Sequence, residues 1–180
     1  VKLLALALIG IGAVGGMLLA RESIWVTNGY ADHHRVRLTE QEVLTMEFRP
    51  TFPRVKAFGI CVEHYNESGE VEVSLLDGEN MVYQEHFPLE GWGDEAYYYK
   101  PVEWKFQKGK EYTMQVRLLD NDQAVDVLIT DDGVLPMAEY GAPRIQGDAV
   151  GGQLVSSITY WYRPTSRTYK IYLALTWMGI

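Results

Sequence analysis

The residue types that most often carry catalysis or metal binding are few in this chain. It has one cysteine, Cys61, and four histidines, His33, His34, His64 and His86. Residues three apart on a strand point to opposite faces, so Cys61 and His64 are not expected to pair as thiol and base. Zinc sites use spacings such as His-x-Glu and Cys-x-x-Cys, and neither pattern occurs in this sequence. We therefore predict a buried Cys61, no metal site, no cofactor and no catalytic residue.

Carboxylates are numerous, with 24 Asp and Glu residues in the chain. Asp120-Asn121-Asp122 and Asp131-Asp132 resemble ligands for a hard cation, but the spacing of a calcium loop is absent. The same residues favour turns, because their side chains bond to nearby backbone, so turn chemistry is preferred to structural calcium. A glycosidase pair of carboxylates is set in space, and the sequence selects no such pair.

An aromatic segment, residues 89–100, offers the best candidate for ligand binding. It contains Gly91-Trp92-Gly93 and Tyr97-Tyr98-Tyr99 among acidic and glycine residues. Exposed aromatic faces could stack on sugar rings, with a carboxylate fixing the orientation. The alternative is that these rings cap the open end of a hydrophobic core. The predicted ligand-binding set is Trp92, Asp94, Tyr97, Tyr98 and Tyr99.

The elements that must position these residues are almost all strands. Alternation of apolar and polar residues predicts strands over 42–48, 55–65, 69–77, 81–87, 101–106, 111–119, 124–130 and 153–162. Asp77-Gly78 predicts a hairpin turn, and residues 131–152 are expected to be irregular. One polar face per strand indicates an antiparallel two-sheet β-sandwich, jelly-roll-like with about eight strands. The inward-facing residues should include Val71, Val73, Leu75, Trp104, Tyr112, Met114 and Val116.

The N-terminal run, residues 3–20, contains no charged side chain. At ~1.5 Å per residue, a helix of this length spans about 27 Å, close to the hydrocarbon thickness of a bilayer. A secretory signal usually has a shorter apolar stretch and a small residue where Leu18 stands. A buried core helix usually carries a polar stripe, which is missing here. A transmembrane helix is therefore preferred to both alternatives, and Gly12 and Gly16 could let another helix approach it.

These patterns divide the chain into four parts. Residues 1–22 are the predicted membrane helix, 23–39 a linker with His33-His34 in solvent, and 40–163 the sandwich. Residues 164–180 form a return segment that becomes apolar after Lys170 and could be either a last strand or the start of a second membrane helix. The chain would then be a fragment of a larger membrane protein. The formal net charge of −8 argues against nucleic acid and against anionic lipid headgroups as partners.

Three runs of the sequence resemble a known family. They are Phe52-x-x-Val55-x-x-Phe58-Gly59-Ile60-x-Val62, Asn66-x-x-Gly69-x-Val71-x-Val73-x-Leu75-x-Asp77, and Lys108-Gly109-Lys110-x-Tyr112-x-Met114. Together they resemble a β-sandwich ectodomain of bacterial multi-pass membrane proteins associated with cell-surface polysaccharide and glycosyl-transfer pathways. The resemblance covers roughly residues 40–162. It implies a domain outside the cytoplasm, between a first membrane helix and the next, and supplies no catalytic residues.

The predicted function is a non-catalytic extracytoplasmic domain of a bacterial membrane protein. It would bind surface glycans or assist surface polysaccharide assembly, and other membrane helices of the same protein would be its neighbours. A structural or protein-interaction ectodomain without a sugar site is the alternative. A glycan-active enzyme is the third hypothesis.

Overall fold

The computed structural model describes residues 22–27, 33–64, 68–89, 96–120, 124–130 and 138–162. Every regular element in these ranges is a β-strand, and none of the described residues forms a helix able to cross a membrane. The predicted membrane helix 1–22 and return segment 164–180 lie outside them, apart from Glu22. The chain divides into two compact units, residues 25–160 and the two ends, 1–24 with 161–180.

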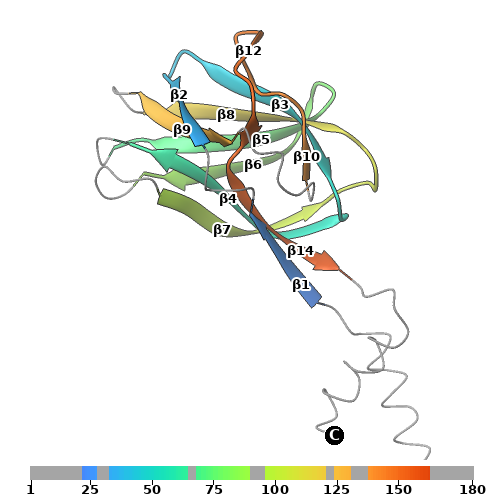
Figure 1. The fold of residues 1–180 in the computed structure, drawn as a ribbon. Helices are drawn as coiled ribbons and strands as arrows, with labels where there is room; N and C mark the ends of the chain where they lie inside the picture. Colours follow the sequence, from blue (N-terminus) through green and yellow to red (C-terminus); the bar gives the residue numbers. More distant parts are fainter. Residues whose placement is uncertain are drawn as a thin grey trace, which may run out of the picture. The chain divides into compact units, whose positions relative to one another are not determined.

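Among the described residues, the strands form two antiparallel sheets of seven strands each. In the first, sheet A, β4 lies between β7 on one side and β14 and β9 on the other (Figure 1). Its strands are β1 (Glu22–Thr27), β2 (His33–Leu38), β4 (Arg54–Glu63), β7 (Ala96–Lys105), β9 (Val125–Thr130), β13 (Gln153–Leu154) and β14 (Ser156–Tyr162).

The second sheet, sheet B, has the order β12-β11-β3-β8-β5-β6, with β10 also on β3. Strands β5 and β6 form the predicted hairpin, and Gly78 in its turn has a φ of 62°, which only glycine adopts freely. The strands are β3 (Val43–Pro50), β5 (Glu70–Asp77), β6 (Asn80–Pro88), β8 (Tyr112–Leu119), β10 (Ala138–Tyr140), β11 (Arg144–Ile145) and β12 (Asp148–Ala149).

The core lies between the two sheets because alternate residues of each strand are apolar and turn inward. All seven residues predicted to face inward are buried, and Trp104 is only 1% exposed. Its indole packs against the Phe58 ring from sheet A and the Tyr83 ring from sheet B, with centroids 5.1 and 5.8 Å away. The prediction of a mainly β, two-sheet sandwich with this core is confirmed.

Three parts of the predicted organisation differ from the structure. Strands β1 and β2 occupy the segment expected to be a linker, and β7 begins at Ala96, inside the expected aromatic loop. Residues 131–152, expected to be irregular, include the short strands β10 to β12. Strand β2 has only two apolar residues in His33–Leu38, so its own pattern is weak, and pairing with β9 holds it in place.

Val155 lies between β13 and β14 in sheet A, and its backbone bonds to two different strands. We call this branching point the fork. Its N–H donates to the carbonyl of Leu128 on β9, at 2.9 Å, and its carbonyl accepts from Cys61 on β4, at 3.1 Å. The side chains of Cys61, Leu128 and Val155 form a fully buried cluster. The prediction of a buried thiol at Cys61 is confirmed.

Polar contacts join the two sheets at two places. The buried hydroxyls of Tyr140, on β10, and Ser156, on β14, lie 2.6 Å apart. At the other side, edge strand β6 meets β7, where the Glu85 carboxylate lies 2.7 Å from the Lys100 ammonium and accepts from the Trp104 indole at 3.4 Å. These contacts satisfy polar groups that packing the sheets would otherwise leave without partners.

Candidate functional site

The structure describes the side chains of two of the five predicted ligand-binding residues, Tyr98 and Tyr99. Trp92 and Asp94 lie outside the described residues, and so does the side chain of Tyr97, although its backbone is part of β7. Tyr98 and Tyr99 are consecutive strand residues, so their side chains point to opposite faces of sheet A. These two tyrosines therefore cannot present their rings on one surface.

Tyr98 faces the core side of sheet A. Its hydroxyl forms a short hydrogen bond with Nε2 of His64, and the two rings are in contact, with centroids 5.7 Å apart. His64 itself is 2% exposed. The pair satisfies two polar groups at the margin of the core, and this side of the strand offers little surface to a ligand.

Tyr99 lies on the outer face of sheet A, the face turned away from the core. Its ring covers Gly59 of the neighbouring strand, since a Cβ on Gly59 would come within 2.9 Å of the tyrosine Cδ2. Its hydroxyl lies 2.6 Å from Oγ1 of Thr159 on β14. The ring is held at both ends and is still 47% exposed. A fixed, half-exposed aromatic face is suited to stacking on a flat apolar surface of a ligand.

A polar network occupies the outer face of sheet B. The Glu72 carboxylate accepts from Gln84 Nε2 at 2.6 Å and from Ser74 Oγ at 3.1 Å, and His86 Nδ1 lies 2.6 Å from Glu70 Oε1. Glu72 and Ser74 are buried although they face outward, because their neighbours bond across them. Within the described ranges, no three His, Cys, Asp or Glu side chains come together as a metal site. We interpret the network as structural.

An ion pair between a buried glutamate and an exposed arginine lies on the outer face of sheet A. Glu63 is 8% exposed, and its Oε2 lies 2.5 Å from Nε of Arg35 on β2. Glu63 is directly opposite Asp126 on β9, so the Arg35 guanidinium offsets repulsion between two carboxylates. The sequence does not reveal this pair, because its members are joined only through the pairing of three strands.

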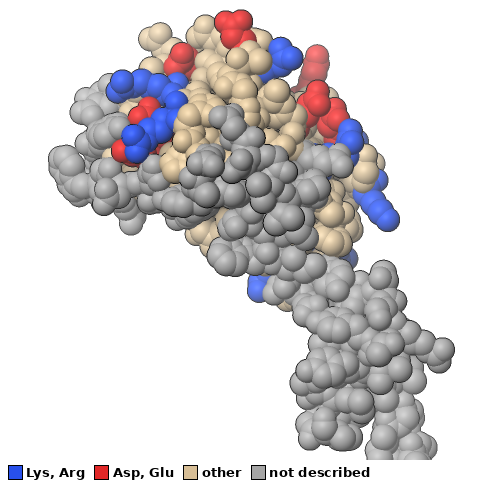
Figure 2. Space-filling model, in the orientation of Figure 1, with Lys and Arg blue, Asp and Glu red and all other residues tan. Residues whose placement is uncertain are grey.

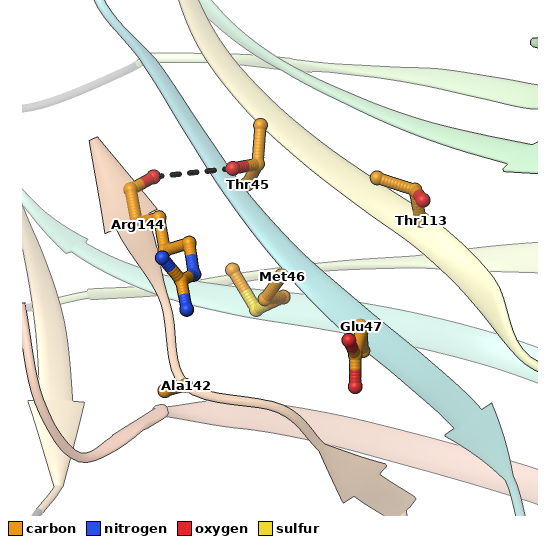
Figure 3. Close-up of a pocket in the computed structure, with 6 residues that line it drawn as sticks. All are labelled: Thr45, Met46, Glu47, Thr113, Ala142 and Arg144. Carbon is orange, nitrogen blue, oxygen red and sulfur yellow. Dashed lines mark hydrogen bonds between the residues drawn. The ribbon is translucent and has the colours of Figure 1, made fainter. Parts of the chain in front are cut away.

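A hollow of about 320 Å³ opens on sheet B beside β3. Its lining residues are Thr45, Met46, Glu47, Thr113, Ala142 and Arg144 (Figure 3). Tyr140 pairs with Phe48 and Arg144 with Thr45, so the three residues 141–143 stand opposite only Met46 and Glu47. One extra residue makes a β-bulge, and Pro143, which has no N–H, is well suited to it. The bulged segment, residues 141–143, borders the hollow through Ala142.

The backbone positions one charged side chain of the hollow and leaves room for the other. Nη1 of Arg144 donates to the carbonyl of Gly147 at 3.1 Å. Gly141 leaves room for Glu47, since a Cβ there would lie 2.9 Å from the Glu47 Cβ. Sequence reasoning missed this site, and the available signal was Gly141-Ala142-Pro143 between two short strand-like segments.

Charges of both signs are interspersed on the face of the molecule shown in Figure 2. Among the described residues drawn there, Lys and Arg lie next to Asp and Glu and do not gather into a patch of one sign. Arg49 and Glu111 form an exposed ion pair at 2.8 Å.

The fold and these sites define an antiparallel two-sheet β domain with a half-exposed tyrosine on one outer face and a small hollow on the other. No family model and no curated protein matches the sequence. One similar solved structure is described as "Structure of infectious bursal disease virus Gx strain", with 8% sequence identity and a TM-score of 0.32. The similarity covers 90% of this chain and 49% of the viral chain.

Proposed function

We propose that the chain contains a non-catalytic, extracytoplasmic β-sandwich, jelly-roll-like in type, from a bacterial membrane protein. The apolar run 3–20 would hold it at the membrane as a transmembrane helix. The domain would bind surface glycans or assist their assembly.

The order of strands supports the membrane part of this proposal. Strands β1 and β14 are neighbours in sheet A, so the chain enters this sheet and leaves it through adjacent strands. An apolar run precedes β1, and another follows β14 after Lys170. Such an arrangement suits a domain inserted between two membrane segments.

The exposed ring of Tyr99 is the observation that carries the glycan-binding part. A ring fixed by the Thr159 hydroxyl loses little conformational freedom on binding, so a stacked sugar would pay only a small ordering cost. Trp92, Asp94 and Tyr97 remain predicted contributors. One shallow site of this kind should bind weakly, at roughly 10 μM to 1 mM.

The location is tested in cells. The full chain should stay in the membrane fraction after a carbonate wash. With Cys61→Ala and Ser68→Cys, an impermeant thiol reagent should label intact cells that lack an outer-membrane barrier, because Ser68 is exposed. Labelling only after lysis would place the domain in the cytoplasm, and a soluble product cleaved near Ala20 would identify residues 3–20 as a signal peptide.

The glycan site is tested with the full chain on an array of bacterial surface glycans. Tyr99→Ala should weaken binding at least tenfold, while Met81→Ala, which removes another exposed apolar side chain, should leave it unchanged. Failure of the unmodified chain to bind any glycan would favour a structural or protein-interaction domain.

A further inference from the structure

The hollow beside β3 is a built feature of sheet B. It lies where the segment paired with β3 carries one more residue than the part of β3 opposite it. The segment is fixed on both sides of the bulge, since Gly141 N–H donates to the Glu47 carbonyl at 2.8 Å and Val150 N–H to the Pro143 carbonyl at 2.9 Å. The backbone that borders the hollow is therefore held in place on both sides, and the side chains of Met46, Glu47 and Arg144 help to line it.

Arg144 and Glu47, the two oppositely charged side chains at this hollow, can form further hydrogen bonds. In the part of the chain that the structure describes, Arg144 has one acceptor for its five N–H groups, the Gly147 carbonyl. Neither Arg144 nor Glu47 forms an ion pair with a described residue, and the two do not pair with each other. In Figure 3 their charged groups lie on either side of Met46. A ligand between them would meet a guanidinium on one side and a carboxylate on the other.

We propose that the hollow binds a carboxylated sugar, a uronic acid residue of a surface glycan. The planar guanidinium of Arg144 matches a carboxylate, which it can bind through two parallel hydrogen bonds. The Glu47 carboxylate accepts from ring hydroxyls, and the hydroxyls of Thr45 and Thr113 add short polar contacts. The volume of about 320 Å³ is at the small end for ligand sites, which suits one sugar ring. This assignment rests on the proposed glycan-facing function and specifies its ligand.

The test uses the full chain in detergent, with saturation-transfer NMR of three added probes: sodium glucuronate, glucose and glycine. Glucuronate should bind on the order of 1 mM, and glucose at least tenfold more weakly because it lacks the carboxylate. Arg144→Gln should reduce glucuronate binding to the level of glucose. Arg117→Gln is the matched control, since Arg117 is an exposed arginine of the same sheet that does not line the hollow.

Several results would overturn the assignment. They are no glucuronate signal, equal signals for glucuronate and glucose, or an Arg144→Gln variant that binds as before with an unchanged melting temperature. Glycine binding as tightly as glucuronate would identify a site for amino acids instead. Tyr99→Ala should leave glucuronate binding intact, so loss of the stacking site and loss of this hollow give separate results. Cytoplasmic labelling of Ser68→Cys would reject the glycan-facing location while leaving the NMR result unaffected.

Discussion

Gly59 and Tyr99 are cross-strand neighbours, and each constrains the other. Gly59→Ala would place a Cβ 2.9 Å from the tyrosine ring and 3.2 Å from the Tyr98 carbonyl. We expect a loss of about 1–3 kcal/mol in the free energy of unfolding, measured with urea. Tyr99→Ala in the same background should recover part of that loss, since the ring is one of the two groups displaced. Strictly additive losses in the double-mutant cycle would contradict the contact.

Among the described residues, Trp104 is the largest fully buried side chain. Trp104→Ala should lower the free energy of unfolding by about 3–5 kcal/mol, because it leaves a cavity among Phe58, Tyr83 and Phe106. Chemical denaturation measures this loss. A value under about 1 kcal/mol would mean that the strand faces solvent in solution.

Tyr140 and Tyr160 should make the domain sensitive to alkali. Burial raises the pKa of both phenols well above the ordinary value of about 10, and the hydrogen bond between Tyr140 and Ser156 offsets part of the rise at Tyr140. Above pH 10 the folded state therefore binds more protons than the unfolded state. The free energy of unfolding should fall as pH rises, by up to about 1.4 kcal/mol per pH unit for each phenol.

Denaturation at pH 9, 10 and 11 measures that slope. The double variant Tyr140→Phe with Ser156→Ala removes one ionising phenol without leaving the Ser156 hydroxyl unpaired, so its slope should be about half. An unchanged slope would show that other groups cause the alkaline transition.

At the scale of elements, the sequence predicted the strands whose own residues alternate. Val71, Val73 and Leu75 are all inward in β5, and the turn at Gly78 lies where Asp77-Gly78 indicated. It did not predict β2, which depends on β9, nor the short strands around the bulge at Pro143. The hollow was not predicted for the same reason. It depends on the register between segments that are distant in the sequence, and no local sequence pattern indicates that register.

The side-chain contacts between β6 and β7 should contribute measurably to stability. Glu85 turns toward the core side of edge strand β6, where Lys100 neutralises it at 2.7 Å. Lys100→Met should cost about 1–3 kcal/mol, because it leaves a partly buried carboxylate without its cation. Adding Glu85→Gln should recover part of this in urea denaturation.

Lys105→Met is the control for that experiment. Lys105 belongs to the same strand, but its side chain is exposed, and its backbone alone bonds to the Tyr83 hydroxyl. A loss equal to that of Lys100→Met would attribute the effect to surface charge and not to the contact with Glu85.

In the molecule as a whole, the two proposed binding sites lie on different sheets. Tyr99 occupies the outer face of sheet A, and the hollow at Arg144 opens on sheet B. The alternation of apolar and polar residues predicted the fold class and the buried core. Among the β7 tyrosines whose side chains are described, only Tyr99 lies on an outer face. A domain with two independent weak contacts gains avidity when both meet one polymer.

The fork at Val155 also governs when the domain can fold during its synthesis. Residues 153–160 form hydrogen bonds with β9 and β4 in the interior of sheet A, although they are the last strand segments of this unit to leave the ribosome. Sheet A therefore stays incomplete, with strand edges open, until those residues have emerged. At about 5–20 residues per second, synthesis of residues 25–160 takes roughly 7 to 27 seconds. The fold of this unit therefore cannot be completed before that last segment arrives.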